Sequence, residues 1–392
     1  MILTTATLTQ AGTAFVFLGV GALAGFIQEA LDLSGAQTGL LITAFALAPL
    51  AAMVPTGRWL DRGSERLVIT SGALLLAAGA MLAGLSGAYL PVLLLLFVGG
   101  AGYSASQPGG SKVVAGWFPI DQRGLAMGIR QTGLPLGGAI AAAILPVLAS
   151  EFGWQRALVV AALVAGATGL VFGAAYRPLP YAFPSPSGGF ALDLRHLLRA
   201  RSVRLAMVAG IGMVSIQLVL VSYLMLYLRD VHGIPLVRGS WMLFATQMAG
   251  VLGRVVLAAW SDALASRLTP VAIAAGTSAL GAGVLAALGK GPSYSMLLVL
   301  SALIGFFAFG WYGPWVVYVA EAAPRGLVGT TLALAMTANQ LAIVLAPPAF
   351  GLIYDVTGSY RVPFVAFGAL LMVVSARVAL EPRRALLEST SS

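Results

Sequence analysis

Twelve long apolar runs constrain this chain more than any other feature of its sequence. A helix that crosses a lipid bilayer needs about 20 mainly apolar residues, and each of the twelve runs meets that length. The predicted spans cover residues 8–30, 37–57, 67–87, 89–117, 124–148, 156–176, 203–228, 236–260, 268–288, 292–320, 327–353 and 361–380. The chain is therefore predicted to be an all-α membrane protein with twelve transmembrane helices.

The amino-acid composition agrees with a chain that lies mostly in lipid. Of the 392 residues, 59% are hydrophobic and only 9% are charged, whereas a soluble domain carries about 25% charged residues. The absence of cysteine excludes disulfides, thiolate metal sites and cysteine nucleophiles. Both histidines, His196 and His232, fall in predicted connections, so paired histidine ligands are not expected. We expect no metal ion and no cofactor.

The basic residues are distributed as in a membrane protein and do not form a patch for nucleic acid. With the N-terminus placed in the cytoplasm, fifteen of the 22 lysines and arginines fall on the cytoplasmic side, Arg58 and Arg254 among them, and five fall outside. Because cytoplasmic connections carry the excess of Lys and Arg, both termini are predicted to be cytoplasmic, in a bacterial inner membrane. The first apolar run lacks a basic leader and is expected to be a retained span.

One long connection, residues 177–202, divides the chain into six spans followed by six. It begins with a Pro-, Ser- and Gly-rich breaker. It continues with a predicted amphipathic helix on the membrane surface, marked by Leu194, Leu197 and Leu198. The predicted parts are an N-terminal six-helix bundle over 1–176, a cytoplasmic linker over 177–202, a C-terminal six-helix bundle over 203–381 and a cytoplasmic tail over 382–392.

The two halves of the sequence repeat one another. After the second span comes GRWLDRGSER, and after the eighth comes GRVVLAAWSDALASR. The fifth span contains LAMGIRQ and the eleventh contains LAMTANQ, which align without a gap over Arg130-Gln131 and Asn339-Gln340. Many secondary transporters are built from such repeats, with the substrate bound near the middle of the membrane between them.

Polar and aromatic side chains inside the spans are the candidate substrate ligands. A charge at bilayer depth costs about 2.5–3.5 kcal/mol and usually faces a cavity or a partner. The sequence places no acidic residue in the middle of a span. Because a guanidinium binds carboxylate or nitrate bidentately, we predict that Arg130 binds an anionic substrate. The predicted substrate-binding set is Arg130, Gln131, Asn339, Gln340, Tyr103, Gln107, Gln217, Gln247, Trp311, Tyr312 and Trp315.

Several of these residues also have a purely structural interpretation. The Arg130 side chain can instead reach the cytoplasmic interface or pair with Asp121 or Glu321 as a gate residue. A lone glutamine, such as Gln217 or Gln247, can simply hydrogen-bond a neighbouring helix, which is worth about 0.6 kcal/mol.

Two spans carry helix breakers at their centre. Span ten contains Gly313-Pro314 between aromatic residues that lie too deep for the usual interfacial belt, and span four contains Pro108-Gly109-Gly110. Interrupted helices in transporters line cavities, so we predict that both segments are flexible parts of gating helices. The alternative is that the aromatic rings only pack against glycine.

The segment after the second span resembles the signature of the major facilitator superfamily of transporters, and the resemblance extends over essentially the full chain. That signature is a glycine, an Asp-Arg pair and further basic residues, here Gly57, Asp61, Arg62 and Arg66. In the family the aspartate caps a helix N-terminus and belongs to a charge cluster that holds one gate closed. An anion at a helix N-terminus is stabilised by about 0.3–2 kcal/mol.

The second copy of the signature is less complete. It keeps Asp262 but has Ala263 in place of the basic partner, so the first copy is expected to carry most of the gate. Lys112, near the end of span four, and Glu321, at the end of span ten, are expected to be further gate residues.

The resemblance implies a secondary transporter that works by alternating access, with two pseudo-symmetric six-helix bundles. More loosely, the stretch from Lys112 through WFPIDQRGLAMGIRQTG is similar to members that carry small anions such as nitrate, cyanate or monocarboxylates. We expect a working monomer that moves a small anion by proton-linked symport or exchange, with facilitated diffusion as a third mechanism.

Three alternatives compete with a small-anion transporter. An exporter of drugs or hydrophobic metabolites is the alternative within the same family. A membrane hydrolase needs a nucleophile with a base, but no Cys, His or paired Asp lies within a span. A receptor is disfavoured because no connection is long enough for a sensory domain. The protein is therefore not expected to be an enzyme.

Overall fold

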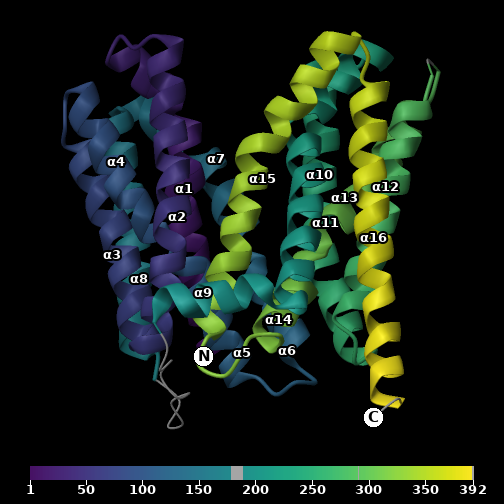
Figure 1. The fold of residues 1–392 in the computed structure, drawn as a ribbon. Coiled ribbons are helices and arrows are strands. Elements are labelled where there is room, and N and C mark those ends of the chain that lie inside the picture. Colours follow the sequence, from purple (N-terminus) through teal and green to yellow (C-terminus); the bar gives the residue numbers. More distant parts are fainter. Residues whose placement is uncertain (178–188, 290, 391–392) are drawn as a thin grey trace. The chain divides into compact units, whose positions relative to one another are not determined.

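The computed structural model describes residues 1–177, 189–289 and 291–390, and within them it consists of α-helices without strands (Figure 1). The helices are α1 (Ile2–Ala30), α2 (Gly35–Arg62), α3 (Glu65–Gly84), α4 (Tyr89–Tyr103), α5 (Ser106–Trp117), α6 (Arg123–Gln131), α7 (Gly133–Phe152), α8 (Trp154–Ala175), α9 (Phe190–Arg199), α10 (Arg201–His232), α11 (Leu236–Ala263), α12 (Leu268–Ala287), α13 (Tyr294–Gly310), α14 (Tyr312–Glu321), α15 (Val328–Thr357) and α16 (Arg361–Thr390).

Twelve segments of these helices are long and apolar enough to cross a membrane, which confirms the predicted fold class. One difference that affects a predicted gate residue lies at the end of α2, which was predicted to stop at residue 57. It continues to Arg62 and ends at Gly63. No glycine or proline stands between 58 and 62 to stop the helix earlier, so Asp61 lies on a helix and not in a connection.

Three of the spans are interrupted, each a few residues before a proline. The helical hydrogen bonds lapse between α4 and α5, between α6 and α7, and between α13 and α14. Each following helix has a proline at its third position: Pro108, Pro135 and Pro314. Proline has no N–H to donate four residues back, so the carbonyls of Ser104, Gln131 and Gly310 lose their helical donor.

The predicted breaks in spans four and ten are therefore displaced toward the N-terminus by several residues. Proline disturbs the turn that precedes it, so α4 ends at Tyr103, ahead of the Pro108-Gly109-Gly110 triplet. The backbone of Trp311, between α13 and α14, stays in the right-handed helical region. These sites are interruptions of hydrogen bonding within one span and not loops. The interruption in span five, at Thr132, was not predicted.

The chain forms two compact units. Unit 1 contains Met1–Pro119, Ile129–Leu197 and Ala323–Thr337, and unit 2 contains Ile120–Gly128, Leu198–Ala322 and Ala338–Ser392. Each unit thus takes one short segment from the other half of the sequence. The predicted division at residues 176 and 203 stays a prediction. Part of the predicted linker, 178–188, lies outside the described residues, as do Lys290 and residues 391–392 of the tail.

Each unit has its own apolar interior. In unit 1, α1 packs against α7 and α8, and α3 packs against α4 and α8. In unit 2, α11 packs against α13, and α16 packs against α10 and α12. Gly253 permits the approach of α11 to α13, because a Cβ there would collide with the Phe306 carbonyl. Large apolar side chains such as Leu85, Trp241 and Leu352 are exposed, as expected for helices that face lipid.

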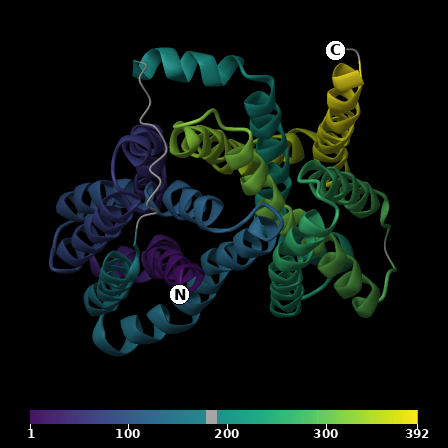
Figure 2. The same cartoon turned by 90° about the horizontal axis from the view of Figure 1, so that it is seen from below.

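The amphipathic helix predicted in the linker is α9. Figure 2, which looks along the spanning helices, shows α9 lengthwise. Leu197 is buried, and the Asp193 carboxylate lies 2.5 Å from a guanidinium nitrogen of Arg58. Arg58 was expected in a solvated cytoplasmic connection; because α2 extends to Arg62, it is instead a buried partner that joins α2 to α9.

Candidate substrate-binding and gating clusters

Unit 1 contains a buried polar cluster around three glutamines. The Gln10 amide donates to the side-chain oxygens of Gln131, at 2.9 Å, and of Gln107, at 3.4 Å. The Gln107 amide donates to the Tyr103 hydroxyl, and the Tyr103 ring stacks on Phe17 with centroids 4.1 Å apart. The structure thus brings together the predicted Tyr103, Gln107 and Gln131 and adds Gln10, which the sequence analysis missed. A polar residue within the first apolar run was the available signal.

Arg130 is fully buried beside this cluster. Its guanidinium donates to the Ser111 hydroxyl at 3.0 Å and to the carbonyls of Ser106 and Gln107 at 2.7 and 3.3 Å. These bonds tie α6 to the first turns of α5, next to the interruption of span four. These three bonds, to one hydroxyl and two carbonyls, orient the guanidinium. Arg130 as a substrate ligand stays a prediction.

Unit 2 contains an aromatic cluster at the interruption of span ten. The rings of Trp311, Tyr312 and Trp315 lie 5.2–5.3 Å apart, centroid to centroid, and both tryptophans are fully buried. The Trp315 indole donates to the Ala206 carbonyl of α10 at 2.8 Å. The structure therefore brings the three predicted aromatic residues together, and packing alone accounts for part of their contacts.

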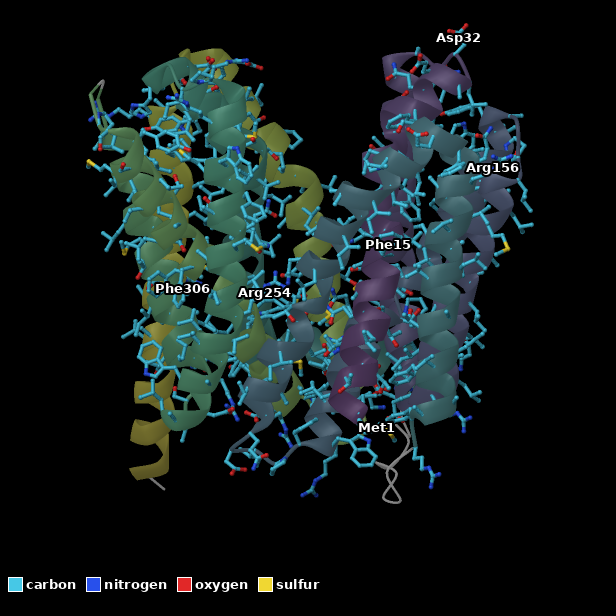
Figure 3. All side chains as sticks on the ribbon, turned by 180° about the vertical axis from the view of Figure 1, so that it is seen from behind. Met1, Phe15, Asp32, Arg156, Arg254 and Phe306 are labelled. Carbon is cyan, nitrogen blue, oxygen red and sulfur yellow. The ribbon has the colours of Figure 1, made fainter. Side chains whose placement is uncertain are left out.

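Arg254 contacts the aromatic cluster. The sequence had not indicated this position. Arg254 was counted among the cytoplasmic basic residues, but α11 carries it inside a span with only 3% of its surface exposed. Figure 3 shows Arg254 and Phe306 about halfway along unit 2. Its guanidinium carbon lies 5.8 Å from the Tyr312 ring centre, and its Nε donates to the Phe309 carbonyl at 3.3 Å. The missed signal was its position two helical turns before Asp262.

Asn339 also belongs to this region of unit 2. It is 3% exposed, and neither polar atom of its amide has a hydrogen-bond partner within the described part of the chain. A Cβ on Gly210 would collide with both Asn339 and Trp315, so these two side chains pack against α10 at Gly210. The Trp311 indole N–H likewise lacks a partner among the described residues. Buried polar groups are usually paired with protein, water or ligand.

Three predicted substrate ligands stand apart from both clusters. Gln217 in α10, Gln247 in α11 and Gln340 in α15 are half-buried. Within the residues that the structure describes, none makes a hydrogen bond to either cluster. Their substrate role stays a prediction.

The first signature copy forms a charge cluster in unit 1. The Asp61 carboxylate accepts from the backbone N–H groups of Gly329 and Thr330 and from the Thr330 hydroxyl, all at 2.7 Å. The Lys112 ammonium lies 3.2 Å from both Asp61 and Glu65. Asp61 thereby satisfies unpaired N–H groups in the first turn of α15, where a negative charge is stabilised.

Gly57 lets this contact form. A Cβ at that position would collide with Ala333 and with the Gly329 carbonyl, so only glycine permits α2 to approach α15 this closely. The glycine and the aspartate of the signature therefore both contact the start of α15. Arg62 and Arg66 are exposed, and neither makes an ion pair within the described residues.

The second copy forms the same arrangement in unit 2, although Ala263 stands where a basic residue was expected; which copy carries more of the gate stays a prediction. The Asp262 carboxylate accepts from the backbone N–H groups of Gly124 and Leu125, at 2.9 and 2.7 Å, in the first turn of α6. Arg267 supplies the cation that Ala263 lacks, 2.5 Å from Asp262 and 3.2 Å from Glu321.

The gapless register of the two copies is Trp-x-Asp followed five residues later by Arg. It pairs Asp61 with Asp262 and Arg66 with Arg267. Burial alone would lower the pKa of the Arg267 guanidinium, but hydrogen bonds to Glu321 and Asp262 outweigh it and raise that pKa. Arg123 adds a second cation 3.3 Å from Glu321, so this cluster holds two acids and two bases.

Comparisons with known proteins agree with this architecture. The family model of the Major Facilitator Superfamily matches residues 6–347 and 241–391. An uncharacterised MFS-type transporter of Mycobacterium tuberculosis is 31% identical over 379 residues, which cover 95% of this chain and 83% of the relative.

Two relatives carry more specific names. A probable sulfoacetate transporter of Cupriavidus necator is 25% identical, over 91% of this chain and 87% of its own length. A probable nitrate/nitrite transporter of Mycobacterium tuberculosis is 26% identical, over 95% of this chain and 94% of its own length.

Solved structures share the fold at lower identity. A human organic anion transporter superposes with a TM-score of 0.78 at 17% identity, over 96% of this chain and 98% of its own. The fucose:proton symporter of E. coli gives 0.77 at 17% identity, over 94% and 97%. The family model, the full-length relatives and the twelve spans establish that this chain is an integral membrane transporter of the major facilitator superfamily.

Proposed function

We propose that this protein moves a small anionic solute across a bacterial inner membrane, with both termini in the cytoplasm. The observation that carries the proposal is a pair of buried guanidinium groups inside the spans, Arg130 in unit 1 and Arg254 in unit 2. Charges at this depth are costly and usually mark a substrate path. A buried positive charge on such a path favours an anion over a cation.

The surroundings of the two arginines support this proposal. Arg130 adjoins Gln107 and Ser111, and Gln107 belongs to the polar cluster with Gln10 and Gln131. Arg254 lies over the Tyr312 ring, and Tyr312 packs against Trp315. Trp315 and the unpaired Asn339 amide both pack against Gly210. Each arginine thus stands next to groups that can orient the polar atoms of a bound anion.

The named relatives support the same cargo class. One is named for sulfoacetate and another for nitrate and nitrite, which are small anions with planar or tetrahedral oxyanion groups. A guanidinium fork matches both geometries. We infer that the solute is an oxyanion or a carboxylate.

The test is uptake into proteoliposomes that contain the purified full chain. Nitrate, acetate and sulfoacetate are the probes, and tetraphenylphosphonium represents the cations that an exporter would carry. The variants are Arg254→Gln, Arg130→Gln and, as the matched control, Arg156→Gln. Arg156 is exposed near one end of unit 1 (Figure 3), so its loss removes the same charge without touching either cluster.

We expect at least one anion to be taken up and the KM of that anion to rise about tenfold or more in Arg254→Gln. A hydrogen bond to a charged group is worth about 1.5–3 kcal/mol, and 1.4 kcal/mol is tenfold in affinity. Arg156→Gln should transport as the wild type does. Anion uptake that is unchanged in both Arg130→Gln and Arg254→Gln would exclude the proposed site. Uptake of the cation alone would make the protein an exporter.

We also propose that anion transport is coupled either to a proton or to the exit of a second anion. No acidic residue lies in the middle of a span, so we infer that a proton enters bound to the anion or that a second anion leaves in exchange. An inward proton gradient should raise anion accumulation in the first case. Preloaded unlabelled anion should raise it in the second. An uptake rate that neither condition changes would indicate facilitated diffusion.

A further inference from the structure

A cavity of about 770 Å³ lies in unit 2 where α10 begins and α16 approaches the end of its span. These two helices pack against each other (Figure 1). The cavity is lined by Arg201, Arg204, Leu205, Val208, Arg377, Leu380 and Glu381. Its lining side chains belong to none of the polar, aromatic and charge clusters described above, although Ala206, whose carbonyl accepts from Trp315, is next to Leu205 on α10.

The polar part of this cavity carries an excess of positive charge. Three arginines face one glutamate, and Arg201 pairs with that glutamate, Glu381, at 2.9 Å. Arg204 donates to the Arg199 carbonyl, a neutral group. Arg377 is exposed and makes no ion pair within the described residues. Two guanidinium charges therefore remain available to an anionic group.

The apolar part of the same cavity indicates what kind of anion fits. Leu205, Val208 and Leu380 lie directly beside the arginines, and the last two are 40% and 49% exposed. These residues belong to segments of α10 and α16 that are long and apolar enough to cross a membrane, so we expect their exposed apolar surface to face lipid. A free phosphate would contact only the arginines. A phospholipid would also place an acyl chain along the three apolar residues.

We propose that this cavity binds an anionic phospholipid, with the headgroup phosphate at Arg204 and Arg377 and an acyl chain along Leu205, Val208 and Leu380. Basic pockets between membrane helices bind anionic headgroups, and each basic residue near the surface contributes about 1 kcal/mol. The guanidinium fork also matches a phosphate bidentately. The lipid would hold the start of α10 against the end of the α16 span.

A second cavity offers an internal comparison. It has a volume of about 600 Å³ in unit 1 and is lined by Ser64, Arg66, Leu67, Thr70, Leu170, Gly173 and Ala174. Its lining contains one arginine where the α10–α16 cavity contains three. The unit 1 cavity therefore also offers apolar side chains to an acyl chain but carries far less positive charge. We expect it to show no preference for an anionic headgroup.

The experiment measures thermal stability and retained lipid, by native mass spectrometry, for the full chain purified in detergent. The additives are phosphatidylglycerol, phosphatidylcholine with the same acyl chains, and glycerol phosphate without acyl chains. The variants are Arg377→Gln, Arg377→Lys and the matched control Arg195→Gln, which removes one exposed charge from α9.

We expect phosphatidylglycerol to stabilise the wild type more than phosphatidylcholine does, and glycerol phosphate to have no effect. The half-saturating concentration of phosphatidylglycerol should rise roughly fivefold in Arg377→Gln. It should rise less in Arg377→Lys, which keeps the charge but loses the bidentate fork, and stay close to wild type in Arg195→Gln. If Arg377→Gln does not fold, Arg204→Gln replaces it with the same expectation.

Three results would overturn the proposal. Equal stabilisation by both lipids would show that the cavity takes acyl chains without regard to charge. Stabilisation by glycerol phosphate to the same extent would make it a site for a free anion. Equal losses in Arg377→Gln and Arg195→Gln would reduce the effect to general surface charge.

Discussion

Asp61 is held by more interactions than any other carboxylate described above. It accepts three hydrogen bonds from the first turn of α15 and faces the Lys112 ammonium. We expect Asp61→Asn to lower the free energy of unfolding by about 3 kcal/mol, the low end of the cost of breaking a buried ion pair, because Lys112 loses one of its two carboxylate partners. The measurement is thermal unfolding of the purified protein in detergent.

The control for this prediction is Asp355→Asn. Asp355 is exposed at the end of α15, so its loss should change stability by less than about 0.5 kcal/mol. Glu65 stays near Lys112 in the Asp61 variant and limits the loss. Equal stability of the two variants would show that the buried cluster contributes nothing to the fold.

Single residues mark where sequence reasoning succeeded and where it could not. The gate role of Asp61 was implied by the resemblance to the family signature, and that of Lys112 by its place near the end of span four. The structure places the two side chains in one charge cluster, and their gate role stays a prediction. Arg254 was counted with the cytoplasmic basic residues, because hydropathy does not report which face of a helix a charge occupies. Arg267 was not recognised as the partner of Asp262 because the expected partner was the adjacent residue, Ala263.

At the scale of the elements, Pro314 determines the interruption between α13 and α14. We expect Pro314→Ala to restore the hydrogen bond from position 314 to the Gly310 carbonyl and to raise the free energy of unfolding by about 1 kcal/mol. Transport should fall, because a continuous span ten cannot adjust the aromatic cluster around Trp311 and Trp315. Thermal unfolding and proteoliposome uptake of the same preparation test both parts.

Pro49 supplies the matched comparison. It lies inside the continuous helix α2, away from any interruption. Pro49→Ala should leave transport close to wild type whatever it does to stability. If the two variants lower transport equally, the interruption in span ten has no special role.

The elements themselves were largely predictable. Apolar length located all twelve spans, and amphipathic spacing located α9. The interruptions were predicted from Gly-Pro and Pro-Gly-Gly patterns but placed too late, because proline acts on the carbonyl four residues before it. The interruption at Thr132 was missed because Leu134-Pro135-Leu136 reads as an ordinary apolar run.

At the scale of the whole molecule, the repeat in the sequence has a counterpart in structure. The first copy places Asp61 of α2 at the start of α15, and the second places Asp262 of α11 at the start of α6. Each aspartate therefore bonds a segment from the opposite half of the chain. The repeat was visible in the sequence, but these partners were not, because they lie 137–138 and 268–269 residues away.

The two charge clusters are expected to stabilise one and the same conformation, which a cysteine-free chain allows to be tested with a single introduced thiol. Thr331 is fully buried in α15, just after the residues that Asp61 holds. Thr331→Cys should react slowly with a membrane-permeant maleimide. Adding Asp61→Asn should raise the labelling rate roughly tenfold. The variant loses about 1.4 kcal/mol of the free energy that favours the conformation in which Thr331 is buried.

The informative variant combines Thr331→Cys with Asp262→Asn. The Asp262 carboxylate accepts hydrogen bonds from the backbone of α6 and from Arg267, and none of its described hydrogen bonds involves α15. If both clusters favour one conformation of the molecule, loss of either shifts the same population, and labelling should rise here too. Asp355→Asn in the same background should leave the rate unchanged. A rate in the Asp262→Asn background that stays within twofold of Thr331→Cys alone would mean that the clusters act separately, each on its own helix.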